Sequence, residues 1–154
     1  PRPSSTPADT SVSSVTPTVD ENATQEPFSS TFILQANSPS YTSNFANDQA
    51  CGWLGVAGQV FDLDGAPLGG VTVYLGGTLA GEDVDLFAES GSADAYGPSG
   101  YEFALRSDPV ASVNTLWIQV YDQEQSQPLS EKIFFSTFSN CDRNLILVNW
   151  NEIR

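Results

Sequence analysis

Two clusters of carboxylates are the residues whose type and spacing come closest to a reactive site. Glu82, Asp83 and Asp85 lie within four positions of one another, and Asp62 and Asp64 flank a single leucine. Two carboxyl groups about 5–10 Å apart can hydrolyse a glycoside. Carboxylate oxygens are also the ligands that Ca²⁺ prefers. Calcium is therefore the one cofactor that these five residues could hold.

The local sequence nevertheless favours structural roles for both clusters. Asp62-Leu63-Asp64-Gly65 resembles the start of a calcium loop but lacks the later ligands and the glutamate at the twelfth position. A β-turn in which aspartate caps the backbone and glycine takes a positive φ explains it more simply. The Glu82–Asp85 cluster is typical of a solvated loop.

The composition excludes several classes of site. The chain has no histidine, which removes the usual base of a nucleophilic triad, and two cysteines alone cannot form a zinc site. The net charge is −14, from 19 acidic and 5 basic residues. That balance argues against nucleic acid and against an anionic membrane surface. No apolar run approaches the ~18 residues of a membrane span. We therefore expect no enzymatic activity and no membrane insertion.

Lys132 is the only lysine of the chain and lies among apolar residues. A lysine in this position could form an isopeptide bond with an asparagine on a neighbouring strand, for which Asn144 and Asn149 are the candidates. A gatekeeper charge at a strand edge is the more common role and is favoured here.

Cys51 and Cys141 lie near the two ends of the folded region. In a secreted chain they predict one disulfide, and in a cytosolic chain they would be two buried thiols; the disulfide is favoured. A cross-link over so long a loop stabilises by about 4 kcal/mol in the chain-entropy model. The sequence lacks any methionine, so we expect that a secretion signal precedes it.

The elements that must position these residues are short strands. Apolar or alternating stretches rich in β-branched and aromatic residues recur between Gly, Pro, Asn and Asp clusters, and no stretch has helical periodicity. Turns are expected at Asp64–Pro67, Gly69-Gly70, Gly76-Gly77, Gly97–Gly100 and Asp108-Pro109. The pattern predicts an all-β, Ig-like or prealbumin-like antiparallel sandwich of about seven or eight strands. The expected strands are Phe28–Gln35, Gly55–Leu63, Val71–Leu75, Asp85–Glu89, Gly100–Arg106, Leu116–Asp122, Lys132–Phe138 and Asn144–Trp150.

Residues 1–27 differ from the rest of the chain. They contain no aromatic residue, and more than half are Pro, Ser or Thr. Such a composition predicts a linker or glycosylated stalk, with Asn22 as the one N-glycosylation candidate. The sequence thus predicts a Ser/Thr/Pro-rich tail, residues 1–27, and one β-sandwich domain, residues 28–154.

The first and last expected strands carry apolar side chains on both faces, although a sandwich strand normally has one polar face. Two explanations are open. The Tyr41–Cys51 segment could fold over the outer face, or another subunit could cover it. The second explanation makes these residues candidates for an assembly surface: Phe28, Phe32, Ile33, Leu34, Ile146, Val148 and Trp150.

Residues 58–75 read GQVFDLDGAPLGGVTVYL, and residues 97–103 read GPSGYEF. Together these motifs resemble the carboxypeptidase regulatory-like domains, which are prealbumin-like sandwiches related to collagen-adhesin B-type repeats. The resemblance covers roughly residues 55–106. It implies a sandwich without catalytic residues that acts as a spacer, stalk, adhesin or filament subunit of secreted bacterial proteins.

The leading hypothesis is a non-catalytic extracellular module, the subunit of a surface filament. The N-terminal segment of one subunit would lie along a sheet edge of the next, giving a head-to-tail homopolymer. The alternative is an adhesin, a stalk-displayed module that binds carbohydrate or protein. Its binding platform would consist of the aromatic residues Tyr41, Trp53, Tyr96 and Trp150.

Overall fold

The structure is a computed structural model that describes residues 30–154. In this range the chain forms eleven strands and two single-turn 3-10 helices. Their bounds are β1 (Phe32–Leu34), β2 (Ser40–Thr42), β3 (Leu54–Phe61), β4 (Thr72–Leu79), β5 (Glu82–Glu89), η3 (Asp94–Tyr96), β6 (Gly100–Arg106), β7 (Ser112–Asp122), β8 (Gln127–Pro128), β9 (Ile133–Thr137), η4 (Cys141–Arg143), β10 (Leu145–Leu147) and β11 (Trp150–Glu152).

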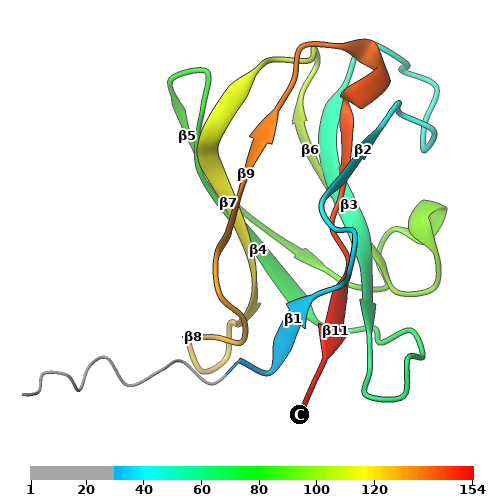
Figure 1. Cartoon of the computed structure of the whole chain (residues 1–154), viewed down its shortest axis with the longest axis vertical. Coiled ribbons are helices and arrows are strands. Elements are labelled where there is room, and N and C mark those ends of the chain that lie inside the picture. The colour runs from blue at the N-terminus through cyan, green and yellow to red at the C-terminus, as the bar shows by residue number, and fades with distance from the viewer. Residues whose placement is uncertain (1–29) are drawn as a thin grey trace, which may run out of the picture.

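The strands form two sheets that face each other (Figure 1). In the first sheet β3 is central, with β6 on one edge and both β10 and β11 on the other. Strand β2 pairs with β10, and strand β1 pairs with β11. In the second sheet the order is β5, β4 and β7, with β8 and β9 pairing consecutive parts of β7. The predicted all-β sandwich is confirmed.

One sheet contains parallel pairs, which the antiparallel prediction did not include. Strands β10 and β11 both run parallel to β3, with Ile146 opposite Val56 and Trp150 opposite Val60. A parallel pair requires a crossover from one end of the sandwich to the other. Here the crossover is the chain from β4 to β9, which forms the second sheet and also contributes β6 to the first.

The core lies between the sheets and follows the two-residue alternation of the strands. In β4 and β7 the inward positions are fully buried, and they include Val73, Leu75, Ile118 and Val120. The first sheet contributes residues such as Val56. These are the β-branched and apolar residues whose pattern predicted strands.

Two local predictions were wrong. Glu82–Asp85, expected in a loop, opens β5, and Gly76-Gly77, expected in a turn, lies inside β4. The turn lies instead at Ala80-Gly81, where both residues have positive φ. Gly76 is needed for a different reason: a Cβ atom there would lie 2.4 Å from the Trp117 ring. Glycine inside a strand can mark such a close approach as well as a turn.

The part of the first sheet's outer face that β10 forms is covered by the chain itself. Leu145 is fully buried in a small cluster with Trp53 and Ala57, and Tyr96 packs against it. Asn144 fixes this cover, because its side chain accepts a hydrogen bond from the Asn44 N–H at 2.8 Å and donates to two carbonyls of residues 50–53. The chain's own cover, one of the two explanations left open, therefore accounts for the apolar outer side of β10.

The predicted disulfide is confirmed. Cys51 and Cys141 are joined with a Cα–Cα separation of 5.1 Å across 90 positions of sequence. The bond ties the covering segment before β3 to η4, which leads into β10. Within residues 30–154, no helix has the length and apolar character needed to cross a membrane.

Candidate assembly groove

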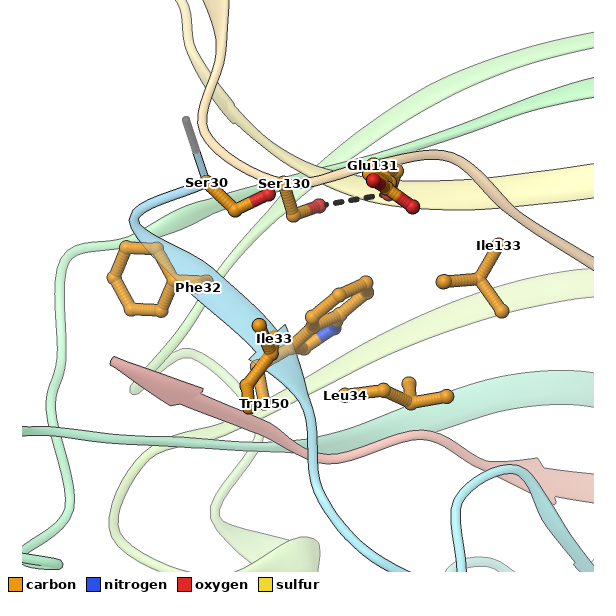
Figure 2. Close-up of a pocket in the computed structure, with 8 residues that line it drawn as sticks. All are labelled: Ser30, Phe32, Ile33, Leu34, Ser130, Glu131, Ile133 and Trp150. Carbon is orange, nitrogen blue, oxygen red and sulfur yellow. Dashed lines mark hydrogen bonds between the residues drawn. The ribbon is translucent and has the colours of Figure 1, made fainter. Parts of the chain in front are cut away.

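An apolar groove opens along the seam between the two sheets (Figure 2). It has a volume of about 310 Å³. One wall is the start of β1 and the other is the segment that leads into β9. The lining residues are Ser30, Phe32, Ile33, Leu34, Ser130, Glu131, Ile133 and Trp150. We call this hollow the seam groove.

The β1 wall is a sheet edge with backbone groups that face the groove. Among the strands of residues 30–154, only β11 pairs with β1. The Phe32 N–H points away from β11 and donates to the Leu129 carbonyl at 2.9 Å. Because an antiparallel ladder alternates its direction every residue, the N–H and C=O of Leu34 also face away from β11. An edge of this kind is a template for another strand.

The opposite wall is held rigidly against β7. The Ser130 hydroxyl accepts a hydrogen bond from the Val120 N–H at 2.8 Å and donates to the Glu131 carbonyl at 2.9 Å. The Gln119 amide donates to the Ser130 carbonyl at 3.1 Å. Ser130 is itself buried. These contacts fix the β8–β9 connection, so the groove is preformed on this side.

The floor of the groove is the indole of Trp150, which is fully buried. Its N–H lies beside the Tyr101 hydroxyl, which donates to the Val148 carbonyl at 2.6 Å. The indole N–H does not reach hydrogen-bond geometry with any described residue. Burial raises the pKa of Tyr101, and the neighbouring indole N–H lowers it to a smaller extent. The floor is therefore aromatic, uncharged and anchored to β10–β11.

The apolar surface continues around β1 onto the outer face of the first sheet. Ile33 is 46% exposed, and it borders both the seam groove and a second hollow of about 410 Å³. Leu63 and Ile153 line that second hollow and are exposed as well. Exposed apolar residues that gather in one place mark interaction surfaces more often than isolated ones do.

The residues expected to form an assembly surface divide into three groups. Ile146, Val148 and Trp150 are fully buried within the chain, and Phe32 is almost so. Ile33 and Leu34 border the groove and remain accessible in part. Phe28 lies outside the described residues, as does the glycosylation candidate Asn22. Ile146 and Val148 therefore do not form an open surface, because both side chains pack in the core between the sheets. Trp150 packs in the same core and contributes only the floor of the groove.

The two carboxylate clusters lie in a turn and on a strand. The Asp62 side chain accepts hydrogen bonds from the N–H groups of Asp64 and Ala66, each at 2.9 Å, and Gly65 has a φ of 84°. The turn interpretation is confirmed. Glu82, Asp83 and Asp85 are exposed on β5. Nowhere in residues 30–154 do three or more potential metal ligands among His, Cys, Asp and Glu gather.

Lys132 and its two candidate asparagines are engaged separately. The lysine ammonium lies 4.3 Å from the centroid of the Trp117 ring, on the second sheet. Asn144 holds the covering segment of the first sheet. The Asn149 amide accepts from the Gln59 N–H at 2.9 Å and donates to Gln35 at 3.1 Å. This arrangement does not bring the lysine to either amide.

The four aromatic residues expected to form a binding platform do not share a surface. Trp53 and Trp150 are buried in different clusters. The Tyr41 hydroxyl donates to the Ser136 carbonyl at 2.7 Å, whereas Tyr96 donates to Glu102 at 2.6 Å. Burial is the larger cause, and the Glu102 carboxylate the smaller, of a raised pKa at Tyr96.

The sequence did not indicate the residues that complete the groove from the second sheet. Ser130, Glu131 and Ile133 precede or open a strand that looks ordinary in sequence. Their position follows from the pairing between β7 and β9, which places Ile133 opposite Ile118. Local patterning carries no signal for which strands will pair.

Comparison with known proteins gives no relative: no family model, no curated protein and no solved structure matches this chain. The resemblance of residues 55–106 to carboxypeptidase regulatory-like domains rests on its motifs alone.

Proposed function

We propose that this protein is a non-catalytic extracellular structural module, a subunit of a surface filament that assembles head-to-tail through its N-terminal segment. The seam groove carries this proposal. It is apolar, it is bordered by the edge of β1 at which the Leu34 N–H and C=O face away from β11, and Ser30 at its mouth is the residue to which residues 1–29 connect.

The N-terminal segment has suitable length and composition. An extended chain spans about 3.3 Å per residue, so 29 residues reach on the order of 95 Å, well beyond one domain of this size. The stretch Thr10–Val19 contains three valines among Ser and Thr. Valine and threonine are β-branched and favour strands. The segment can therefore reach the groove of a neighbour and add a strand along β1.

The disulfide and the composition support the extracellular and non-catalytic parts of the proposal. A disulfide persists in oxidising compartments. The chain has no histidine, and both of its cysteines are joined to each other. Among the polar side chains that line the groove, the Ser130 hydroxyl takes part in holding its wall.

A head-to-tail contact has a clear signature in solution. The full chain should form a concentration-dependent series of oligomers in analytical ultracentrifugation, with filaments visible by negative-stain microscopy. Removal of residues 1–29 should leave monomers with an unchanged thermal unfolding transition, because the core of the sandwich lies within residues 30–154.

A charge placed in the groove should also leave the protein monomeric, although residues 1–29 are still present. Ile33→Lys introduces an ammonium that docking would bury, so it should prevent assembly. Val113→Lys is the matched control, because Val113 is 76% exposed on β7, outside the groove lining. A full chain that remains monomeric at high concentration would refute the proposal, and so would assembly that survives Ile33→Lys.

A further inference from the structure

The outer face of the second sheet carries a cluster of aromatic side chains that the proposed assembly does not use. Tyr74 of β4 is its centre. Its ring stacks on Phe87 of β5, with centroids 4.2 Å apart and planes 17° apart. Trp117 and Tyr121 of β7 meet the Tyr74 ring edge-on at 4.9 Å and 5.2 Å. We call these four residues the aromatic face.

The β4 backbone is adapted to this cluster. Gly76 leaves room for the Trp117 ring, which would otherwise collide with a side chain. The Lys132 ammonium lies 4.3 Å from the centroid of that ring. A cation is attracted to the electron-rich face of an aromatic ring. The aromatic face thus already accommodates one organic ammonium group.

Strand β5 adds carboxylates beside the rings. Asp83, Asp85 and Glu89 lie on the same side of β5 as Phe87, because side chains two residues apart in a strand share a face. Successive members of this row are about 7 Å apart. The Asp85 carboxylate is also the main cause of a raised pKa at Tyr74. The aromatic face therefore has a negative border.

A small hollow lies where the aromatic face meets the carboxylates of β5. It has a volume of about 230 Å³ and is lined by Thr72, Phe87, Ala88, Glu89 and Gln123. Phe87 is 43% exposed there. In the described part of the chain, no hydrogen bond involves the side chain of Thr72, Glu89 or Gln123. One exposed ring beside a carboxylate, an amide and a hydroxyl is a set of groups that can bind a single sugar ring.

The charge of the site selects among sugars. The C–H groups of a pyranose carry partial positive charge and pack on the negative face of an aromatic ring. The carboxylate row repels uronic acids and sulfated sugars and attracts ammonium groups. We propose that this hollow binds a glycan whose sugars carry free amino groups, with Phe87 stacked on one ring and Glu89 paired with its ammonium.

A lysine-rich peptide would satisfy the charge but not the remaining groups. The Gln123 amide and the Thr72 hydroxyl each donate as well as accept hydrogen bonds, which suits sugar hydroxyls. A lysine ammonium only donates. Charged residues on an edge strand such as β5 can also serve to prevent pairing with another chain. An exposed phenylalanine would work against that role, so the exposure of Phe87 favours a binding surface.

Calorimetric titration of the full chain tests the proposal. The probes are a glucosamine hexasaccharide, its fully N-acetylated form and a hexalysine peptide, at a mildly acidic pH where the free amines are protonated. The glucosamine oligomer should bind, and its affinity should fall as salt rises from about 0.1 M to about 1 M, because the screening length shortens from about 10 Å to about 3 Å. Phe87→Ala should weaken binding about tenfold.

Glu89→Gln tests the ammonium contact without changing the shape of the side chain, and it should weaken binding of the glucosamine oligomer severalfold. Phe45→Ala is the matched control, because it removes a phenylalanine that is 59% exposed in the segment between β2 and β3, which covers the other sheet. Three results would each overturn the proposal: no binding of the glucosamine oligomer, equal affinity for the N-acetylated form, or equal affinity for the peptide. The glycan proposal does not depend on assembly, so none of these results would count against the proposed role of the seam groove.

Discussion

Asn144 is the residue that determines whether the outer face of the first sheet is covered. Its side chain is almost fully buried and makes three hydrogen bonds, to the Asn44 N–H and to the carbonyls of Ala50 and Trp53. An asparagine side chain can satisfy a donor and two acceptors at once, which no apolar residue of similar size can do. The residue thus joins η4 and β10 to the segment that covers them.

Replacing Asn144 should therefore be costly. Asn144→Ala leaves one donor and two acceptors without partners, and we expect the free energy of unfolding to fall by about 3 kcal/mol. Urea denaturation followed by tryptophan fluorescence measures it, with Asn140→Ala as the exposed control. A loss no larger than that of the control would contradict this role.

Tyr101 gives the stability a dependence on alkaline pH. Its side chain is fully buried, and burial raises its pKa above the ordinary value of 10.0. Between pH 10 and the raised pKa of the folded state, Tyr101 is deprotonated in the unfolded chain but keeps its proton in the folded chain. The contribution of Tyr101 to the free energy of unfolding is therefore fully present below pH 10 and is lost progressively above it.

The slope of that fall is measurable. Each such group contributes about 1.4 kcal/mol per pH unit. Denaturant unfolding at a series of alkaline pH values should show the fall, and Tyr101→Phe should reduce the slope relative to the parent chain. An identical slope in both proteins would show that Tyr101 is not responsible.

At the level of elements, the close contact between β3 and the β10–β11 connection determines the shape of the first sheet. The two short strands pair consecutive parts of β3, and the break between them lies at Val148 and Asn149. The Asn149 side chain accepts the hydrogen bond of the Gln59 N–H that a continuous strand would have accepted through its backbone. Gly58 allows the close approach, since a Cβ atom there would lie 1.8 Å from the Val148 carbonyl oxygen.

Gly58→Ala should disrupt this pairing. The obstructing atom belongs to the backbone and cannot turn aside, so we expect a loss of about 3 kcal/mol in the free energy of unfolding. Gly69→Ala is the control, because its nearest neighbour would be at an ordinary 3.7 Å. Similar thermal transitions for the two variants would show that the β3 contact is not tight.

The extent to which the sequence predicted these elements has a physical basis. Strands such as β4 and β7 were found because their own residues are rich in β-branched and aromatic types, with apolar residues at every second position. The parallel position of β10 and β11 was missed, because pairing between residues about 90 positions apart leaves no local signal. Gly76-Gly77 misled the prediction because glycine serves a turn and a close aromatic contact equally well.

The same limit applies to the candidate site. Ile33 was identified from two-sided apolarity, and it does border the groove. Ile146 and Val148 have the same pattern but are buried by the chain itself. Sequence alone cannot distinguish a face that is covered within the chain from one that is left for a partner, because both need apolar residues.

For the whole molecule, the disulfide restricts the unfolded chain more than it contributes contacts. Cys51 and Cys141 are both exposed, and the bond closes a loop across 90 positions. The double variant Cys51→Ser, Cys141→Ser should lose about 4 kcal/mol in the free energy of unfolding. Guanidinium denaturation measures the loss. Because the sandwich core is independent of the bond, the variant should retain the strand signature in circular dichroism, and a chain without that signature would contradict this expectation.

The central claim is that the N-terminal segment of one molecule lies in the seam groove of another. The direct test places a photoreactive amino acid at Ile133 in the groove and mixes equal amounts of unlabelled and ¹⁵N-labelled chains before illumination. The account predicts cross-links between residue 133 and residues 1–29 in mixed-isotope pairs, which Ile33→Lys abolishes. Cross-links confined to single molecules, or their absence from residues 1–29, would contradict it.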